Sequence, residues 1–120
     1  MQILIVEDDT FFQKFYAQKL TEQGFTVIVA NNGKEAIEEI KKETPNLILL
    51  DLIMPEMDGF EFLQTFAKTK KHIPILIFST LGQEEDIKKA KDLGATDYVN
   101  KSFFDFPVLL EKIKNLVHNT

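Results

Sequence analysis

The sequence contains no cysteine and no tryptophan, and only five glycines and four prolines among its 120 residues. Without cysteine the chain can form neither disulfide bonds nor thiolate metal sites, so a reducing compartment suits it. No apolar run approaches the roughly 20 residues that cross a bilayer, and the short run near the N-terminus lacks the basic region of a signal peptide. We therefore expect a cytoplasmic protein that does not bind membranes.

Positive charge is also scarce. The 14 lysine and arginine residues are outnumbered by 19 acids, which gives a net charge of −5. This balance disfavours direct binding to nucleic acid. The length suits a single domain, residues 1–120, and the 44% hydrophobic content is enough for a core without disulfides.

Five short apolar runs recur along the chain. They are continuous rather than alternating, which is typical of parallel strands covered on both faces. They comprise residues 3–6, 27–30, 47–50, 75–78 and, more weakly, 98–99.

Segments with helical spacing of apolar residues separate these runs. The third segment, for example, carries a stripe of Phe60, Leu63 and Ala67. Asp9 and Asp58 stand where helix N-caps are expected. The alternation predicts an α/β fold, a three-layer sandwich of five helices around a five-stranded parallel sheet with right-handed crossovers.

Polar side chains follow four of the predicted strands. In folds of this class ligands bind at the carboxyl ends of the strands, which lie along one edge of the sheet. The residues at these ends are Glu7-Asp8-Asp9, Asp51, Ser79-Thr80 and Asn100-Lys101. We therefore expect several acids, a hydroxyl and a lysine to converge at that edge.

Such a cluster favours phosphoryl transfer. Neighbouring carboxylates raise each other's pKa unless a cation lies among them, and Mg²⁺ prefers oxygen ligands of this kind. A lysine ammonium can pair with phosphate oxygens, and a carboxylate beside it can attack phosphorus. The cation and Lys101 would then stabilise charge on the phosphoryl oxygens while Asp51 carries the group.

The segments ILIVEDD, LLDLIMPEMDG, PILIFST and DYVNKSF resemble the receiver domain of two-component response regulators, including chemotaxis regulators of that type. The resemblance covers essentially the whole chain, and DLxMPxMDG is its most specific part. It implies a flavodoxin-like (βα)5 sandwich with strand order 2-1-3-4-5. It also implies a signalling domain, not an enzyme, that assists its own phosphorylation and dephosphorylation.

The resemblance further implies a role for each residue at this edge. Asp51 corresponds to the phosphoacceptor. The metal, Mg²⁺ or Mn²⁺, is bound directly by Asp8 and Asp51 and largely through water by Glu7. The backbone carbonyl of Ile53 supplies another ligand.

Three further positions correspond to the family's switch residues. Ser79 matches the switch hydroxyl, Tyr98 the aromatic switch and Lys101 the phosphate-contacting lysine. The implied donor is a histidine kinase or a histidine phosphotransfer protein. Phosphorylation would alter the face formed by the fourth helix, fifth strand and fifth helix, which binds a downstream protein target or output domain. The resemblance is compatible with a monomer or a weak phosphorylation-dependent dimer.

The sequence departs from the family at a few positions. Ser102 replaces a proline that commonly follows a cis bond, and a cis bond without proline costs roughly 2.5–4 kcal/mol. We expect either a trans Lys101–Ser102 bond with a rearranged loop or a strained cis bond, which leaves the direction of Lys101 open. Thr80 is bulkier than the common alanine and is predicted to shield the phosphoryl group. Phe103 and Phe106 are predicted to pack into the core, and Phe104 is predicted to lie over the surface.

Two other functions stay open. A pseudo-receiver would keep the fold as a binding module without phosphoryl transfer, and Ser102 is its only support. An aspartate-nucleophile phosphatase resembling haloacid dehalogenases would place its nucleophile on the first strand, with a second acid two residues later. Here the candidate is Asp51 on the third strand, and position 53 is isoleucine.

Overall fold

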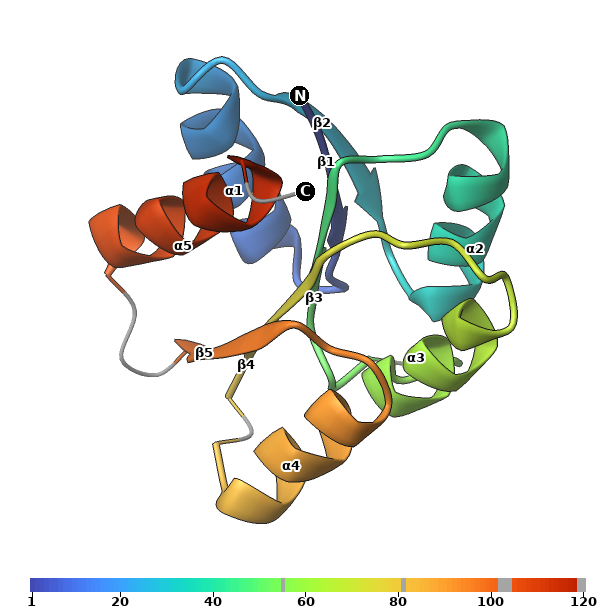
Figure 1. Ribbon diagram of the computed structural model, residues 1–120. Coiled ribbons are helices and arrows are strands. Elements are labelled where there is room, and N and C mark those ends of the chain that lie inside the picture. The colour runs from blue at the N-terminus through green and yellow to red at the C-terminus, as the bar shows by residue number, and fades with distance from the viewer. Residues whose placement is uncertain (55, 81, 102–104, 119–120) are drawn as a thin grey trace.

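The computed structural model describes residues 1–54, 56–80, 82–101 and 105–118. Strands and helices alternate along the chain (Figure 1). The strands are β1 (Gln2–Val6), β2 (Thr26–Ala30), β3 (Leu47–Leu50), β4 (Ile75–Ser79) and β5 (Asp97–Asn100). The helices are α1 (Thr10–Glu22), α2 (Gly33–Lys42), α3 (Gly59–Ala67), α4 (Glu84–Asp92) and α5 (Phe106–His118).

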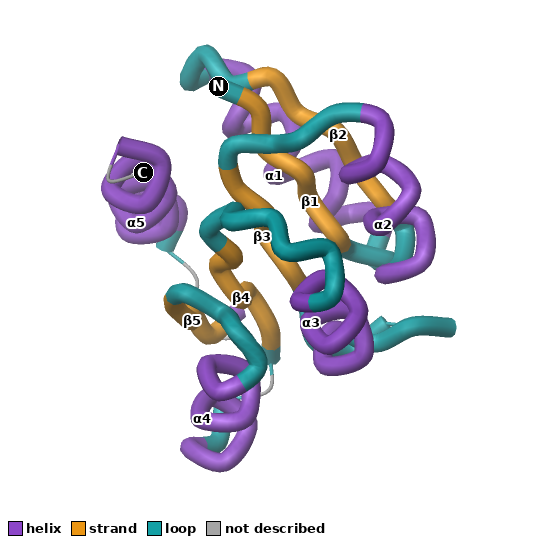
Figure 2. Tube along the Cα trace, turned by 45° about the vertical axis from the view of Figure 1, so that its right-hand side comes forward, coloured by secondary structure: helices purple, strands orange, loops and turns teal. Residues whose placement is uncertain are grey.

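The five strands form one parallel sheet in the order β2-β1-β3-β4-β5 (Figure 2), which confirms the predicted fold class and strand order. Helices α1 and α5 cover one face, and α2, α3 and α4 cover the other (Figure 1). Because every strand runs the same way, all five carboxyl ends lie along one edge.

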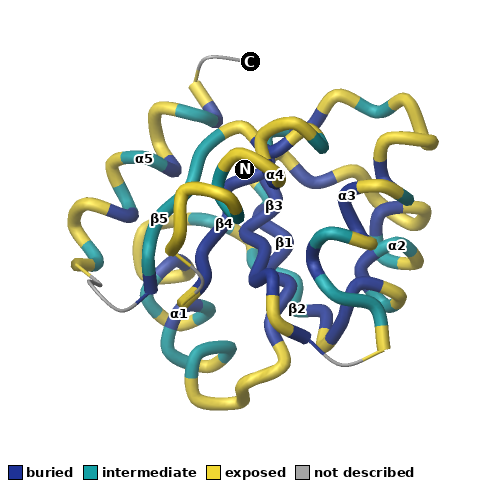
Figure 3. The backbone as a smooth tube through the Cα atoms, turned by 90° about the horizontal axis from the view of Figure 1, so that it is seen from below, coloured by how far each residue is buried: buried dark blue, intermediate teal, exposed yellow. Residues whose placement is uncertain are grey.

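Burial differs between the central and outer strands (Figure 3). Every residue of β3 and β4 is buried, as the continuous apolar runs predict. Strands β2 and β5 are the sheet edges, and most of their residues are only partly buried. The run at residues 27–30 is as apolar as the central ones, so its edge position follows from the strand order that the resemblance implies and not from its composition.

The two helix N-caps predicted from the sequence, Asp9 and Asp58, are both observed, and the structure adds a third that was not predicted. Asp9 Oδ1 accepts a hydrogen bond from the Phe12 amide at 3.1 Å, and Asp58 Oδ1 caps α3 at 2.9 Å. Asn32 caps α2 in the same way, its Oδ1 accepting from the Glu35 amide at 2.9 Å. Each cap satisfies an amide that has no partner within its helix.

The predicted apolar stripe of α3 was partly wrong. Leu63 is buried as expected, but Phe62 and Phe66 form the rest of the buried face, while Ala67 is exposed. Phe60 is only partly buried against the same core. With three phenylalanines in one short helix, spacing alone did not determine which rings face the sheet.

Among the described residues, none of the helices is both long enough and apolar enough to cross a membrane.

Candidate functional site

The Asp51 carboxylate lies at the carboxyl end of β3, where the chain turns toward α3. The loop returns so closely that a Cβ atom on Gly59 would lie 2.6 Å from Leu52 Cα and 2.7 Å from the Asp51 carbonyl oxygen. The Gly59 amide donates to the Leu52 carbonyl at 3.0 Å, and the Ile53 amide donates to Asp51 Oδ1 at 3.2 Å. The loop backbone therefore holds the carboxylate in place.

Glu7 and Asp8 follow β1, the neighbour of β3, and bring two more carboxylates to the same edge. One carboxylate oxygen from each of Glu7, Asp8 and Asp51 lies within 4.8 Å of the others. Glu7 and Asp51 are buried, whereas Asp8 is exposed. The structure thus brings together the acids that the sequence predicted to meet.

The Lys101 side chain enters this acidic cluster from the end of β5. Its ammonium donates to Glu7 Oε1 and, at 3.2 Å, to Asp51 Oδ2. The side chain is only 4% exposed. The substitution of Ser102 for proline left the direction of Lys101 open. In the structure the Lys101 ammonium points toward Asp51.

Burial makes the Glu7 carboxyl a weaker acid than a solvent-exposed glutamate. Burial, partly opposed by the hydrogen bond from Lys101 and reinforced by the charge of Asp51, raises the pKa of Glu7 from 4.5 to about 7. In the absence of a further cation, one lysine does not fully compensate two buried carboxylates and an exposed one. Mg²⁺ prefers oxygen ligands, and each of these three neighbouring side chains offers a carboxylate oxygen. The residues therefore fit the predicted metal.

An open cleft lies over Asp51 and provides access to it. The residues that line it are Glu7, Asp8, Asp9, Phe12, Asp51, Ile53, Thr80 and Lys101. The Ile53 side chain is 51% exposed, and Thr80 is exposed too. Thr80 thus lies in the cleft beside Asp51, which is the position that the shielding hypothesis requires.

Neither of the two predicted switch residues is among those that line the cleft. Ser79 is completely buried at the end of β4 and does not line the cleft. Tyr98, on β5, is partly exposed, but its hydroxyl oxygen is buried. Burial and the charges of Asp86 and Asp51 raise the pKa of Tyr98 to about 12, although the Ser79 hydroxyl acts the other way. These two buried hydroxyls lie on the neighbouring strands β4 and β5.

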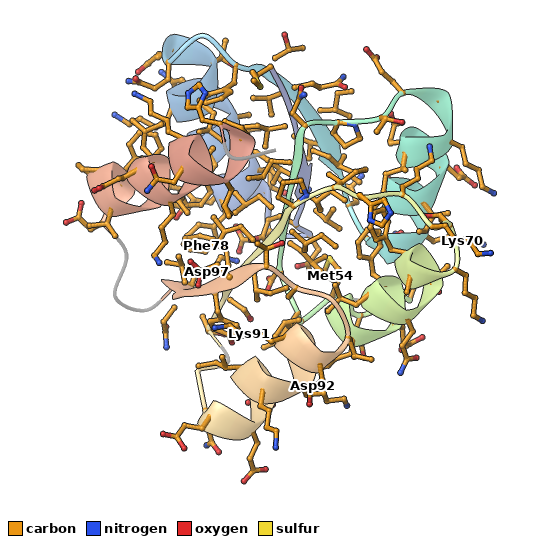
Figure 4. The ribbon with its side chains drawn as sticks, viewed as in Figure 1. Met54, Lys70, Phe78, Lys91, Asp92 and Asp97 are labelled. Carbon is orange, nitrogen blue, oxygen red and sulfur yellow. The ribbon has the colours of Figure 1, made fainter. Side chains whose placement is uncertain are left out.

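Aromatic rings close the remaining side of Lys101, and this was not predicted. Its Nζ lies 4.2 Å from the centroid of the Phe12 ring and 5.7 Å from that of Phe78. Phe78 projects from β4 toward the α1 and α5 side of the sheet, whereas Met54 belongs to the core on the other side (Figure 4). Phe12 lies in the first turn of α1, three residues after the Asp9 cap, and no pattern in the sequence predicts its contact with Lys101.

The Gln13 side chain is a second contact that sequence reasoning missed. Its amide nitrogen donates to the Glu7 carbonyl and, at 2.7 Å, to Asn31 Oδ1. It thereby ties the end of β1 to the turn that precedes α2.

Three predictions fall on residues that the structure does not describe. The geometry of the Lys101–Ser102 bond and the positions of Phe103 and Phe104 lie outside the described residues. Phe106, by contrast, begins α5 and packs, partly buried, against the core between α1, α5 and the sheet.

Comparisons with known proteins agree on one family. The family profile described as "Response regulator receiver domain" matches residues 3–114. Response regulator RR06 of Streptococcus pneumoniae is 37% identical over 117 residues, covering 98% of this chain and 53% of that protein. Transcriptional regulatory protein CusR of Escherichia coli is 34% identical and covers 98% of this chain and 51% of its own length. The chain thus spans about half the length of these relatives.

Solved structures show the same likeness. The BeF3-activated N-terminal receiver domain of Klebsiella pneumoniae RstA has a TM-score of 0.91 at 28% identity, with 98% of both chains covered. A CheY-like receiver domain protein from Methanospirillum hungatei JF-1 has a TM-score of 0.92 at 30% identity, covering 98% of this chain and 94% of that one. The sequence motif, the sheet order and these comparisons together show that the chain belongs to the receiver domain family of two-component response regulators.

Proposed function

We propose that this chain is a phosphorylation-activated switch, a single domain that accepts a phosphoryl group on Asp51. The observation that carries the proposal is the Lys101 ammonium, held 3.2 Å from Asp51 Oδ2 beside a cluster of three carboxylates. A lysine so deeply buried costs free energy unless its charge is used or compensated. The donor would be a histidine kinase or a histidine phosphotransfer protein.

In the transfer, an Asp51 carboxylate oxygen attacks phosphorus while the bond from phosphorus to the donor histidine nitrogen breaks. The product is an acyl phosphate, and the released imidazole keeps its electron pair and takes a proton from solvent. Lys101 donates to the phosphoryl oxygens, whose charge it partly neutralises. Mg²⁺ or Mn²⁺, when bound, would supply the remaining positive charge. The residues that would hold it are Glu7, Asp8, Asp51 and the carbonyl of Ile53.

Signalling requires that the phosphoryl group favour one of two conformations. Ser79 and Tyr98 are suited to this because their buried hydroxyls lie close together on the neighbouring strands β4 and β5, and the charge of Asp51 acts on Tyr98. Repacking there would alter the face formed by α4, β5 and α5. A downstream protein or an output domain would bind that face, and the chain would act in the cytoplasm as a monomer or a weak phosphorylation-dependent dimer.

The test is incubation of the purified chain with Mg²⁺ and phosphoramidate or acetyl phosphate, followed by intact-mass measurement. We expect a gain of one phosphoryl group that is stable in acid and labile in base. Asp51→Asn should abolish the gain, and Asp92→Asn, an exposed acid on α4, should not change it. Chelation of the metal should also prevent the gain.

Two outcomes would contradict the proposal and favour a different function. No gain with any donor, including a histidine phosphotransfer protein, would favour a pseudo-receiver that binds partners without phosphoryl transfer. Rapid repeated turnover of unrelated phosphoesters would instead indicate an aspartate-nucleophile phosphatase.

A further inference from the structure

The Lys101 ammonium is enclosed on two sides by different kinds of group. Glu7 and Asp51 accept its hydrogen bonds on one side. On the other side its Nζ lies 4.2 Å from the Phe12 ring centroid, within the range of a cation–π interaction. With the side chain 4% exposed, the ring takes a position that solvent would otherwise occupy.

The orientation of the Phe12 ring is determined by the core beneath it. It stacks on Tyr16 at 5.7 Å with an interplanar angle of 4°. Tyr16, which is 1% exposed, meets Phe78 edge to face at 5.0 Å and 83°. The ring that contacts Lys101 therefore belongs to a packed aromatic group that joins α1 to β4.

We propose that Phe12 is a positioning residue for Lys101. Its ring, supported by Tyr16 and Phe78, holds the ammonium between Glu7 and Asp51, where it meets the incoming phosphoryl group. This inference rests on the proposed phosphoacceptor function for its kinetic consequence, but the contact itself is independent of that function.

The neighbouring loop explains why such a contact matters in this chain. Lysine has a flexible four-carbon stem, and Lys101 lines the same cleft as Asp8 and Asp9. Residue 102 is serine and lacks the backbone restraint of proline. The ring restrains the lysine at its charged end instead.

Three variants separate positioning from packing. Phe12→Leu keeps an apolar side chain but removes the aromatic face, and Phe12→Tyr restores it. Phe15→Leu is the matched control, because Phe15 is also on α1 and also contacts Tyr16, edge to face at 5.3 Å and 89°. The cation over the Phe15 ring is Lys19, at 5.7 Å, not Lys101.

The first readout is the rate of phosphorylation by phosphoramidate with saturating Mg²⁺. We expect Phe12→Leu to slow this rate about tenfold, since a desolvated cation–π contact is lost. Phe12→Tyr should recover most of the loss. The second readout is the proton NMR shift of the Lys101 CεH₂ group, assigned by comparison with Lys101→Arg. The ring current of Phe12 should move it upfield in the wild type and in Phe12→Tyr, but not in Phe12→Leu.

A wild-type rate in Phe12→Leu would overturn the proposal, as would an unchanged Lys101 shift in that variant. An equal loss of rate in Phe15→Leu would also overturn it, because general packing of α1 would then be responsible. If the wild-type chain accepts no phosphoryl group from any donor, the proposed function fails, and the Lys101 shifts alone decide whether Phe12 positions the lysine.

Discussion

The Lys101 ammonium and the Glu7 carboxylate form an ion pair whose side chains are only 4% and 5% exposed. A buried pair of this kind contributes little net stability, since removing two charges from water offsets most of their attraction. Asp51, at 3.2 Å from the same ammonium, adds a second acceptor and leaves the cluster with excess negative charge. The arrangement is therefore better suited to binding a cation and a phosphoryl group than to stabilising the fold.

The first prediction concerns pH and Glu7. Because burial raises the pKa of Glu7 from 4.5 to about 7, the folded chain keeps a proton in this range that the unfolded chain has lost. The stabilising contribution of Glu7 to the free energy of unfolding is therefore fully present below pH 4.5, the pKa of Glu7 in the unfolded chain. It is lost as the pH rises through about 7, the pKa in the folded chain. Linkage puts this loss at about 3 kcal/mol, which solvent screening reduces to roughly 2 kcal/mol. Urea denaturation in metal-free buffer, at about pH 5 and about pH 8, measures it.

Glu7→Gln should remove most of that pH dependence, because glutamine does not titrate. Asp8→Asn is the control, since Asp8 is exposed and adjacent in the sequence. A Glu7→Gln variant with the full wild-type dependence would show that other groups are responsible.

The second prediction concerns Mg²⁺. A cation that binds only the folded chain should raise its free energy of unfolding by about 2.7 kcal/mol at a concentration one hundred times the dissociation constant. The gain should be larger at pH 8 than at pH 5, because protons compete for the carboxylates. Thermal denaturation with increasing Mg²⁺ measures it.

Asp8→Asn should reduce the Mg²⁺ effect strongly. Asp92, labelled on α4 in Figure 4, offers the control Asp92→Asn, which removes the same charge outside the cluster. Equal loss in both variants would mean that the effect reflects total charge and not a site.

The third prediction concerns Gly59. In Gly59→Ala the new Cβ would meet backbone atoms of Asp51 and Leu52 at 2.7 Å and 2.6 Å, and neither can move without shifting β3. Overpacking of this kind costs roughly 1–3 kcal/mol, measured by urea denaturation. Phosphorylation should slow as well, because the Asp51 backbone moves.

Gly33→Ala is the comparison for Gly59→Ala. Its nearest neighbour would be the flexible Met57 side chain, at 2.9 Å, although the Met57 carbonyl lies at 3.0 Å. It should cost less stability and leave phosphorylation less affected. The reverse order of the two variants would refute the proposed role of close backbone packing at Asp51.

The fourth prediction concerns Thr80. This residue is exposed and lines the cleft over Asp51, so its side chain can obstruct water that attacks the phosphoryl group. Thr80→Ala should speed spontaneous dephosphorylation severalfold, as followed by loss of the phosphorylated mass after donor removal. Thr80→Ser is the control for the methyl group alone. An unchanged rate in Thr80→Ala would exclude shielding.

Much of the fold follows from local sequence. The apolar runs predicted β1 to β5 because parallel strands in a covered sheet need continuous apolar residues. Asp9 and Asp58 predicted helix starts because their side chains cap free amides. The stripe of α3 was partly wrong, since the choice between Phe60, Phe62 and Phe66 depends on how the helix rotates against the sheet.

The composition of the site was also foreseeable, because strand ends determine which residues reach the carboxyl edge. Asp51 and Lys101 are separated by much of the chain, yet the parallel topology brings them together. The contact between Phe12 and Lys101 was not foreseeable, and neither was the complete burial of Ser79.

By itself, therefore, the sequence determined the alternation of elements, the parallel sheet and the group of polar residues at one edge, because strand length and helix capping are local properties. Only the tertiary structure decided which rings of α3 face the sheet, that Thr80 and not Ser79 lines the cleft, and that an aromatic ring covers Lys101. These outcomes depend on side-chain rotamers and on packing between elements that are distant in the chain, and no local pattern encodes them.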